Sequence, residues 1–147
     1  MEWQLAARGG TGTLYFYVED SEFRTKIEES FLGEEDRNTL EPTLNEYAWF
    51  DKNSGESTHP IGQKTPNPYG LYDLYGNVFE WLHDWHDELP MPRELTDYDG
   101  PAEGDYRMYI GGSWNTGVGH CLVTDRIMDE PDVRHNYVGF RLLLSLE

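Results

Sequence analysis

The chain has 147 residues, enough for one domain with a single hydrophobic core. Its formal net charge of −17 would repel phosphate groups, which excludes nucleic acids and anionic membranes as partners and favours cations and basic protein segments. The single cysteine, Cys121, excludes an intrachain disulfide. No apolar segment approaches the ~20 residues that a membrane-spanning helix needs, so the sequence predicts a soluble chain and leaves its compartment open.

Regular structure is predicted most clearly near the two ends. Residues 1–8 are predicted to form a helix that ends at Gly9 and Gly10, because glycine readily adopts the left-handed conformation that closes helices. Residues 107–114 are predicted to contain a strand that ends in a Gly-Gly turn. Residues 138–146 are predicted to form a closing strand, and their run of leucines indicates burial on both faces.

The segments between these ends are predicted to be less regular. Residues 13–18 are β-branched and aromatic, which is typical of a short strand, and residues 21–32 carry apolar side chains every four residues, which predicts a helix. The acidic residues 33–41 are expected to form a solvated loop, and residues 89–105 form a second polar loop. Residues 45–85 are dense in aromatic rings and glycines and are expected to be irregular.

Four sequence blocks carry a resemblance to a known family. They are EWQLAARGG at residues 2–10, EYAWFDKNSGESTHPIGQK at 46–64, NPYGLYDLYGNVFEWLHDW at 67–85, and GGSW at 111–114 with GFR at 139–141. Their order and spacing resemble the formylglycine-generating enzyme, or sulfatase-modifying factor, family.

The resemblance implies a fold and a domain organisation. The family fold is α+β, an elaborated C-type lectin-like fold with little regular secondary structure. Residues 1–147 would form one domain of this type, in which residues 12–44 are an insertion relative to typical members. The first half of the family domain would precede Glu2, so the chain is expected to be the C-terminal part of an N-terminally truncated domain, one that needs its missing half or self-associates.

Two acids, Asp73 and Glu80, bracket a Gly-Asn turn. Calcium takes six to eight oxygen ligands and accepts backbone carbonyls as well as carboxylates. Spacing alone favours an ordinary turn with two solvated acids. The resemblance instead implies a Ca²⁺ site formed by the side chains of Asp73 and Glu80 and the carbonyls of Gly76 and Val78.

Residues 111–121, GGSWNTGVGHC, correspond to the catalytic segment of the family. Active members carry two cysteines five residues apart there, which are thought to bind Cu(I) and, with O₂, to oxidise a target cysteine to formylglycine. Thiolates select Cu(I), and a hydroxyl does not replace them. Here Cys121 falls at the second cysteine position and Thr116 at the first, so copper binding and oxidase activity are not expected. Ser113 matches a family active-site serine, and the alternative for Cys121 is a small buried apolar residue.

Residues 115–129 depart from the family and mix small, polar and apolar side chains. The resemblance places them on the exposed concave face of the fold, which the variable proteins of diversity-generating retroelements use to bind different ligands. A rigid frame that presents irregular residues suits recognition of a peptide or protein ligand. The candidate ligand-binding residues are Trp114, Asn115, Thr116, His120 and Asp125. Ordinary divergence within an enzyme family is the other interpretation of the same segment.

Overall fold

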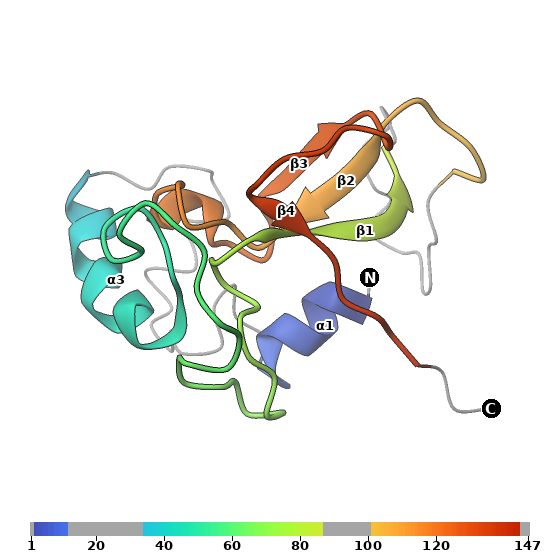
Figure 1. Ribbon diagram of the computed structural model, residues 1–147. Helices are drawn as coiled ribbons and strands as arrows, with labels where there is room; N and C mark the ends of the chain where they lie inside the picture. The colour runs from blue at the N-terminus through green and yellow to red at the C-terminus, as the bar shows by residue number, and fades with distance from the viewer. Residues whose placement is uncertain (1, 12–33, 87–100, 145–147) are drawn as a thin grey trace.

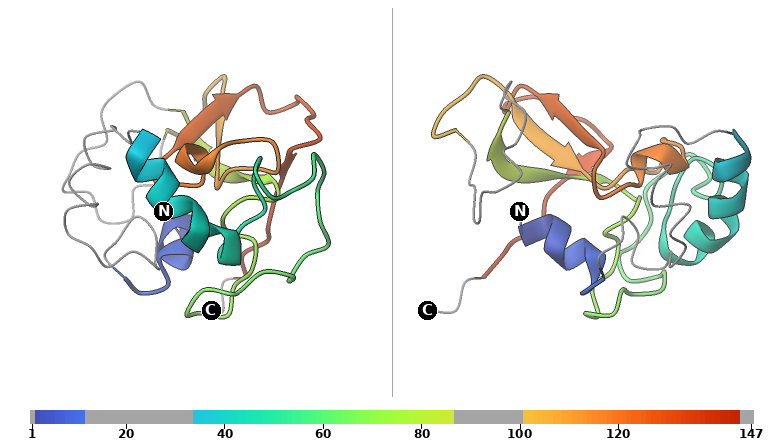
Figure 2. Two further views of the ribbon diagram at one scale, coloured as in Figure 1. Left: turned by 90° about the vertical axis from the view of Figure 1, so that its left-hand side faces the viewer. Right: turned by 180° about the vertical axis from the view of Figure 1, so that it is seen from behind.

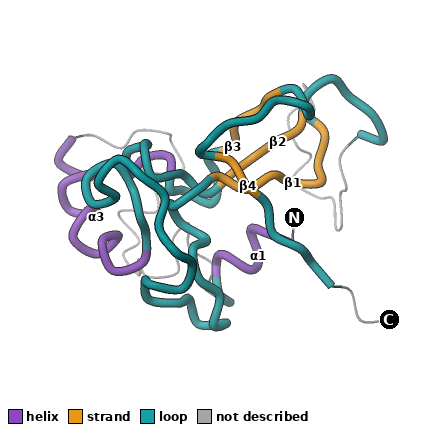
Figure 3. The backbone as a smooth tube through the Cα atoms, in the orientation of Figure 1, coloured by secondary structure: helices purple, strands orange, loops and turns teal. Residues whose placement is uncertain are grey.

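The computed structural model describes residues 2–11, 34–86 and 101–144. It contains the helices α1 (Glu2–Arg8) and α3 (Glu34–Tyr47), the short 3₁₀ helix η1 (Val118–His120), and the strands β1 (Phe79–Trp85), β2 (Arg107–Ile110), β3 (Arg126–Asp129) and β4 (Val138–Gly139). Most of the described backbone between them is turn and loop, as Figure 3 shows. The predicted α+β class with little regular secondary structure is confirmed.

The four strands form one small sheet in the order β3-β2-β1-β4. The three longer strands are antiparallel neighbours, with Tyr109 of β2 opposite Trp81 on one side and Ile127 on the other. The two residues of β4 pair in parallel with Phe79 and Glu80 at the beginning of β1. In Figure 1 the sheet and α3 lie at opposite ends of the molecule, and α1 lies below the sheet, beside the outgoing C-terminal segment.

The hydrophobic core lies where α1, α3 and the loops that precede β1 and follow β2 meet. The first helix buries Trp3 and Ala7, four residues apart on one face. Figure 2 shows from two further sides that long loops connect the helices and strands. The remaining members of this buried cluster are Leu40, Leu44, Ala48, Phe50, Leu74, Tyr75, Ile110, Val118, Cys121 and Val123. A core built from so many loop residues depends on specific side-chain contacts more than on regular periodicity.

The predicted loop at residues 33–41 is wrong, because α3 runs from Glu34 to Tyr47. Leu40 and Leu44 lie four residues apart on this helix and are both buried in the core. Pro42 stands between them, and a proline inside a helix is normally disfavoured, which obscured the short apolar stripe in the sequence. Tertiary packing of two leucines therefore stabilises a helix whose composition is otherwise acidic.

The predicted helix at the N-terminus is confirmed, and it ends at Gly9, which has a φ of 58°. The predicted strand before the Gly-Gly turn is confirmed as β2. Strand β1 arises within residues 45–85, which were expected to be irregular, because β2 and β4 pair with it.

The closing strand is confirmed only over Val138–Gly139, and its predicted burial is wrong. Leu142, Leu143 and Leu144 are exposed by 88%, 74% and 80%, because no described strand covers them. The strand predicted at 13–18, the helix predicted at 21–32 and most of the loop at 89–105 lie outside the described residues, and the insertion at 12–44 stays a prediction. Neither described helix is long and apolar enough to cross a membrane.

Candidate functional site

The acidic turn, residues 73–80, opens on a cavity of about 570 Å³ that Asp73, Val78 and Glu80 line together with Asn77. Gly76 does not line it. Asp73 has a φ of 56° and its Oδ2 accepts a hydrogen bond from the backbone N of Gly62 at 2.8 Å. Its Oδ1 is buried and has no partner among the described residues. A buried carboxylate oxygen without a partner is costly, so this atom has capacity to contact a cation, although the described residues contain no cluster of three or more His, Cys, Asp or Glu side chains that could hold a metal ion.

Unlike Asp73, Glu80 has both carboxylate oxygens hydrogen-bonded by side chains of two other segments. Its Oε2 accepts from the Trp3 indole Nε1 at 2.5 Å and from Arg141 Nε at 2.6 Å, and its Oε1 accepts from Arg141 Nη2 at 2.6 Å. This two-pronged contact with a guanidinium is the strong form of an ion pair. Glu80 thereby joins β1 to α1 and to the segment that follows β4.

Only some of the oxygens of this turn are suited to bind calcium. Asp73 Oδ1 supplies an oxygen with free coordination capacity, and Ca²⁺ prefers oxygen ligands. Both oxygens of Glu80 already contact Arg141, whose positive charge opposes a second cation. Of the two carboxylates, Asp73 therefore has the freer oxygen for such an ion, and Val78 lines the same cavity. Trp3 and Arg141 belong to the quoted blocks EW and GFR, but nothing in those letters predicted their contact with Glu80.

The GGS segment, residues 111–116, folds into a turn closed by its own side chains. Ser113 is fully buried, and its Oγ donates to Asn115 Oδ1 at 2.7 Å. The backbone N of Ser113 donates to Thr116 Oγ1 at 2.9 Å, and Thr116 Oγ1 donates to the carbonyl of Ser113 at 3.2 Å. The hydroxyls of Ser113 and Thr116 thus stabilise the turn.

The Cys121 side chain is fully buried and belongs to the core cluster. Burial raises the pKa of its thiol to about 12, and the negative charges of Asp51 and Asp125 act in the same direction. A Cβ added at Gly112 would lie 2.6 Å from the Cys121 Sγ, so the GGS turn packs directly over the sulfur. This environment favours the neutral thiol over the thiolate that nucleophilic chemistry and metal binding require.

The other candidate residues lie closer to the surface. Asn115 and His120 are exposed, and Trp114 and Asp125 are partly buried. His120 Nδ1 lies 2.7 Å from Asp125 Oδ2, which orients both side chains. The structure thus separates this candidate set into the turn of Trp114, Asn115 and Thr116, in which Asn115 is exposed, and the surface pair of His120 and Asp125.

The acidic turn and the GGS segment are joined through the backbone. Gly76 N donates to the carbonyl of Gly111 at 2.7 Å, and Trp114 N donates to the carbonyl of Asn77 at 2.8 Å. The Asn77 side chain makes two further hydrogen bonds with the backbone of His59. Any ion bound at the acidic turn would therefore rigidify the turn that presents Trp114 and Asn115.

Residues 1–146 match the sulfatase-modifying factor enzyme 1-like domain, the FGE-sulfatase family, over nearly the entire chain. The chain belongs to this family. The predicted resemblance is confirmed, and curated relatives support it. The formylglycine-generating enzyme of Mus musculus is 34% identical over 117 residues, covering 71% of this chain and 32% of its own length. The serine/threonine-protein kinase pkn1 of Chlamydia pneumoniae is 31% identical over 144 residues, covering 95% of this chain and 19% of its own.

The family fold is also present in a solved structure. Treponema denticola variable protein 1 superimposes with a TM-score of 0.74 at 36% identity, covering 95% of this chain and 43% of its own. The chain therefore spans less than half the length of each of these three proteins. The relatives of this chain thus include a kinase, a formylglycine-generating enzyme and a variable protein, and family membership alone does not specify an activity.

Proposed function

We propose that this chain is a ligand-binding module of the sulfatase-modifying factor family that does not oxidise cysteine and that binds Ca²⁺ at its acidic turn. The observation that carries the non-oxidising part of the proposal is the complete burial of Cys121. Burial raises the pKa of this thiol to about 12, which favours its neutral form at pH 7. A single thiol in this state offers neither a nucleophile nor a pair of thiolates for Cu(I).

The side chain at the other expected cysteine position supports the same proposal. Thr116 occupies it, and its hydroxyl both accepts from and donates to the backbone of Ser113. A threonine so engaged maintains the shape of the turn without any redox chemistry. The chain therefore retains the shape of the family's GGS turn but lacks the pair of cysteines that the proposed oxidation would need.

The surface beside this turn suits recognition of a basic peptide or protein segment. Asn115 and His120 are exposed, Trp114 is partly buried, and Asp125 adds a carboxylate beside His120. An aromatic ring, an amide and a carboxylate on a rigid turn are typical of recognition surfaces. The net charge of −17 favours cationic ligands.

The purified chain is expected to leave a CxPxR peptide thiol unchanged in the presence of Cu(I) and O₂. Thiol titration over time measures this, with the formylglycine-generating enzyme of Mus musculus as the active control. Cys121 should also resist a thiol reagent in the native protein and react fully in urea, because only unfolding exposes the sulfur. Protein-dependent loss of the peptide thiol would disprove the non-oxidising assignment.

The calcium part of the proposal rests on the unpartnered oxygen of Asp73. Adding Ca²⁺ to chelator-treated protein should raise the melting temperature by several degrees, because a ligand that binds only the native state stabilises it. Asp73→Asn should remove most of this rise and change the melting temperature in chelator much less. The matched control is Asp51→Asn, an exposed aspartate outside the lining of the cavity, which should keep the full rise. A calcium response that survives in Asp73→Asn would place the ion elsewhere.

A second candidate is a variable protein of the retroelement type, in which residues 115–129 are diversified to match different ligands. The 36% identity to Treponema denticola variable protein 1 over 95% of this chain favours it. This version predicts a near-copy of the coding sequence for residues 107–141 beside a reverse transcriptase gene in the source genome. If the source genome contains neither the near-copy nor the reverse transcriptase gene, the second candidate is rejected and the module would bind one fixed ligand.

A further inference from the structure

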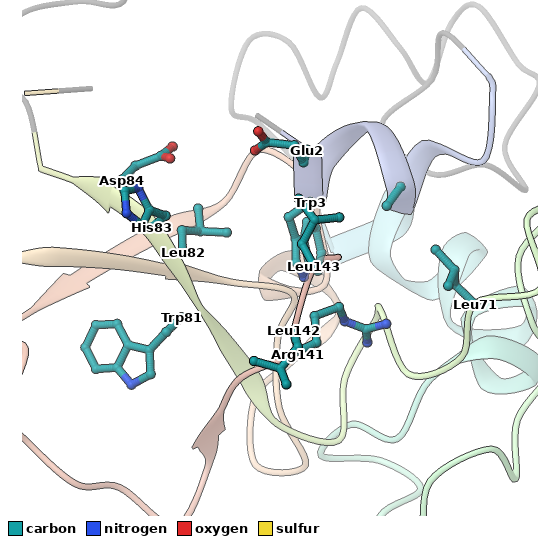
Figure 4. Close-up of a pocket in the computed structure, with 11 residues that line it drawn as sticks. Glu2, Trp3, Leu71, Trp81, Leu82, His83, Asp84, Arg141, Leu142 and Leu143 are labelled. Carbon is teal, nitrogen blue, oxygen red and sulfur yellow. The ribbon is translucent and has the colours of Figure 1, made fainter. Parts of the chain in front are cut away.

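The sheet presents Trp81 on the face opposite to α1. Glu80 on β1 accepts a hydrogen bond from Trp3 of α1, and the next residue, Trp81, points to the other face, because successive side chains of a strand alternate. Figure 4 shows the Trp81 ring pointing away from Trp3, whereas Leu82 lies on the same side of β1 as Trp3. This face is also separate from the cavity at the acidic turn, which Trp81 does not line.

Aromatic side chains of three segments meet on this face. The ring centroids of Trp81 and Tyr109 lie 5.1 Å apart with the ring planes at 87°, so the two rings form a corner. Phe79 is buried and packs edge-on against Tyr109 at 5.1 Å and against Tyr137 at 6.3 Å between centroids. Trp81 and Tyr137 are partly exposed. Because cations bind to the faces of such rings, this aromatic face, formed by Trp81, Tyr109 and Tyr137, is suited to a positively charged ligand.

A carboxylate, that of Asp129, lies on the same side of the sheet as the aromatic face. Ile127 of β3 pairs directly with Tyr109 of β2, and Asp129 follows two residues later, so its side chain points the same way as that of Ile127. Burial raises the pKa of Tyr109 to about 12, with smaller effects in the same direction from Tyr137 and Asp129. The negative charge of Asp129 therefore acts on the aromatic face.

Two neighbours orient Asp129 and leave it with capacity for a ligand. Its Oδ2 lies 2.9 Å from His135 Nε2, and its Oδ1 accepts from the backbone N of Glu130 at 2.9 Å. His135 stacks on Tyr137 with the ring centroids 4.7 Å apart, which joins the acid to the aromatic face. The hydrogen bond with His135 lowers the pKa of Asp129, so its carboxylate stays charged at neutral pH. The Asp129 side chain is 31% exposed, and each carboxylate oxygen can accept more than one hydrogen bond.

The end of β1 shows which cation suits a ring of this kind. The guanidinium carbon of Arg107 lies 3.7 Å from the centroid of the Trp85 ring. A guanidinium stacks on aromatic planes and donates a fork of hydrogen bonds to a carboxylate, whereas an ammonium has no such plane. Over the described ranges of the chain, no cation lies on the Trp81 ring. Trp81 is therefore open to a guanidinium from a ligand.

The aromatic face is continuous with the surface at the GGS turn. Trp114 Nε1 donates to the carbonyl of Asn136 at 3.3 Å. Asn136 stands between His135 and Tyr137 in the chain. A peptide that contacts Trp114 therefore reaches the aromatic face with a neighbouring side chain. The net charge of −17 attracts a basic peptide and repels a second copy of the chain.

We propose that the aromatic face and Asp129 form an arginine-binding site, which takes one arginine side chain of a basic peptide segment. The guanidinium stacks on the exposed rings, and Asp129 supplies the counter-charge. This inference rests on the ligand-binding function proposed above and names the side chain that the ligand must carry. It does not depend on calcium or on the absence of oxidase chemistry, since the acidic turn and Cys121 lie outside the site.

The probe for this site is a glycine-serine peptide that carries two arginines, compared with the same peptide carrying two lysines. Calorimetry at physiological ionic strength measures binding, because salt screens long-range attraction to the acidic chain. The arginine peptide should bind several-fold more tightly than the lysine peptide, because only a guanidinium both stacks and forks. Asp129→Asn should weaken binding of the arginine peptide roughly tenfold, because a charge-assisted hydrogen bond is lost.

Substitutions of Trp81 test the ring contact. Trp81→Leu keeps an apolar side chain but removes the ring, and should weaken binding of the arginine peptide roughly fivefold. Trp81→Phe restores an aromatic face and should recover part of this loss, which a merely structural role of Trp81 does not predict. The matched controls are Asp51→Asn and Tyr69→Leu, exposed residues of the same types outside the site, and both should leave binding unchanged. Melting curves verify that each variant is folded.

Three results would overturn the arginine site. Equal affinity for the two peptides, or equal losses in Asp129→Asn and Asp51→Asn, would show only general attraction to an acidic chain. A loss in Asp125→Asn without one in Asp129→Asn would place the peptide beside His120, so the recognition surface would stand and the arginine site would not. Failure of both peptides to bind would also overturn the site, while the thiol assay with the CxPxR peptide would still decide the non-oxidising assignment.

Discussion

Replacement of Gly76 by alanine should destabilise the domain by about 3–5 kcal/mol, the range of severe single substitutions. The φ of Gly76 is 75°, a left-handed conformation that costs a residue with a side chain roughly 1–2 kcal/mol. An added Cβ would also lie 2.1 Å from the carbonyl oxygen of Trp49 and 2.8 Å from its carbon. These are backbone atoms, so no side-chain rotation relieves the clash.

Backbone movement at Gly76 would have a further cost. Gly76 N donates to Gly111 O, and Asn77 N donates to Trp49 O, both at 2.7 Å. Moving the turn away from Trp49 would weaken these buried hydrogen bonds, each with a net contribution of about 1 kcal/mol. The clash and the hydrogen bonds therefore add to the conformational cost.

Gly70→Ala is the matched control for this prediction. Its φ is 76°, but an added Cβ would meet no atom within 4 Å, so only the conformational cost of about 1–2 kcal/mol should remain. Urea unfolding followed by tryptophan fluorescence measures both variants. Equal destabilisation of the two would show that the acidic turn is not packed against Trp49 as described.

Glu80→Gln should destabilise the domain by about 3 kcal/mol, the lower end of the range for breaking a buried ion pair. Glu80 is nearly buried, whereas the Arg141 side chain is 32% exposed, and this exposure reduces the penalty of leaving the guanidinium unpaired. Glutamine preserves the shape of the side chain but loses the charge-assisted contacts with Arg141. The variant should be less stable in chelator as well as in Ca²⁺, since Arg141 and Trp3 contact Glu80 without any ion.

Asp84→Asn is the control for Glu80→Gln. Asp84 lies on the same strand, but its Oδ2 is 3.4 Å from Arg126 Nη1, a longer contact through a single pair of atoms, so Asp84→Asn should destabilise the domain less than Glu80→Gln. A double-mutant cycle between Glu80→Gln and Arg141→Gln isolates the pair, with additive effects arguing against a direct interaction. Together with Asp73→Asn, this cycle separates the structural role of Glu80 from calcium binding.

Much of the fold and the family could be predicted from short sequence signals. The helix before Gly9 and the strand before Gly111 carry strong local preferences, and the structure has both. The α3 helix could not be predicted, because Leu40 and Leu44 become an apolar stripe only when the core receives them. Strand β1 likewise depends on β2, which lies more than twenty residues further along the chain.

The candidate site, like the fold, could be predicted from the sequence only in part. Asp73, Glu80 and Thr116 can be read from the sequence, but only the family resemblance implied a cation at the two acids and a lost cysteine at position 116, since the spacing of the acids alone favoured an ordinary turn. The sequence did not indicate that Arg141 neutralises Glu80, or that one oxygen of Asp73 is buried without a partner. These are contacts between residues far apart in the chain, which residue type and spacing do not specify.

By itself, the sequence determined the family, the α+β class and the absence of a second cysteine, because each depends only on which residues occur and in what order. The tertiary structure alone decided that the Cys121 thiol is enclosed and that its pKa is raised, since both depend on the atoms packed around it. It also decided that the closing leucines are exposed, because a strand is buried only when neighbouring segments cover it.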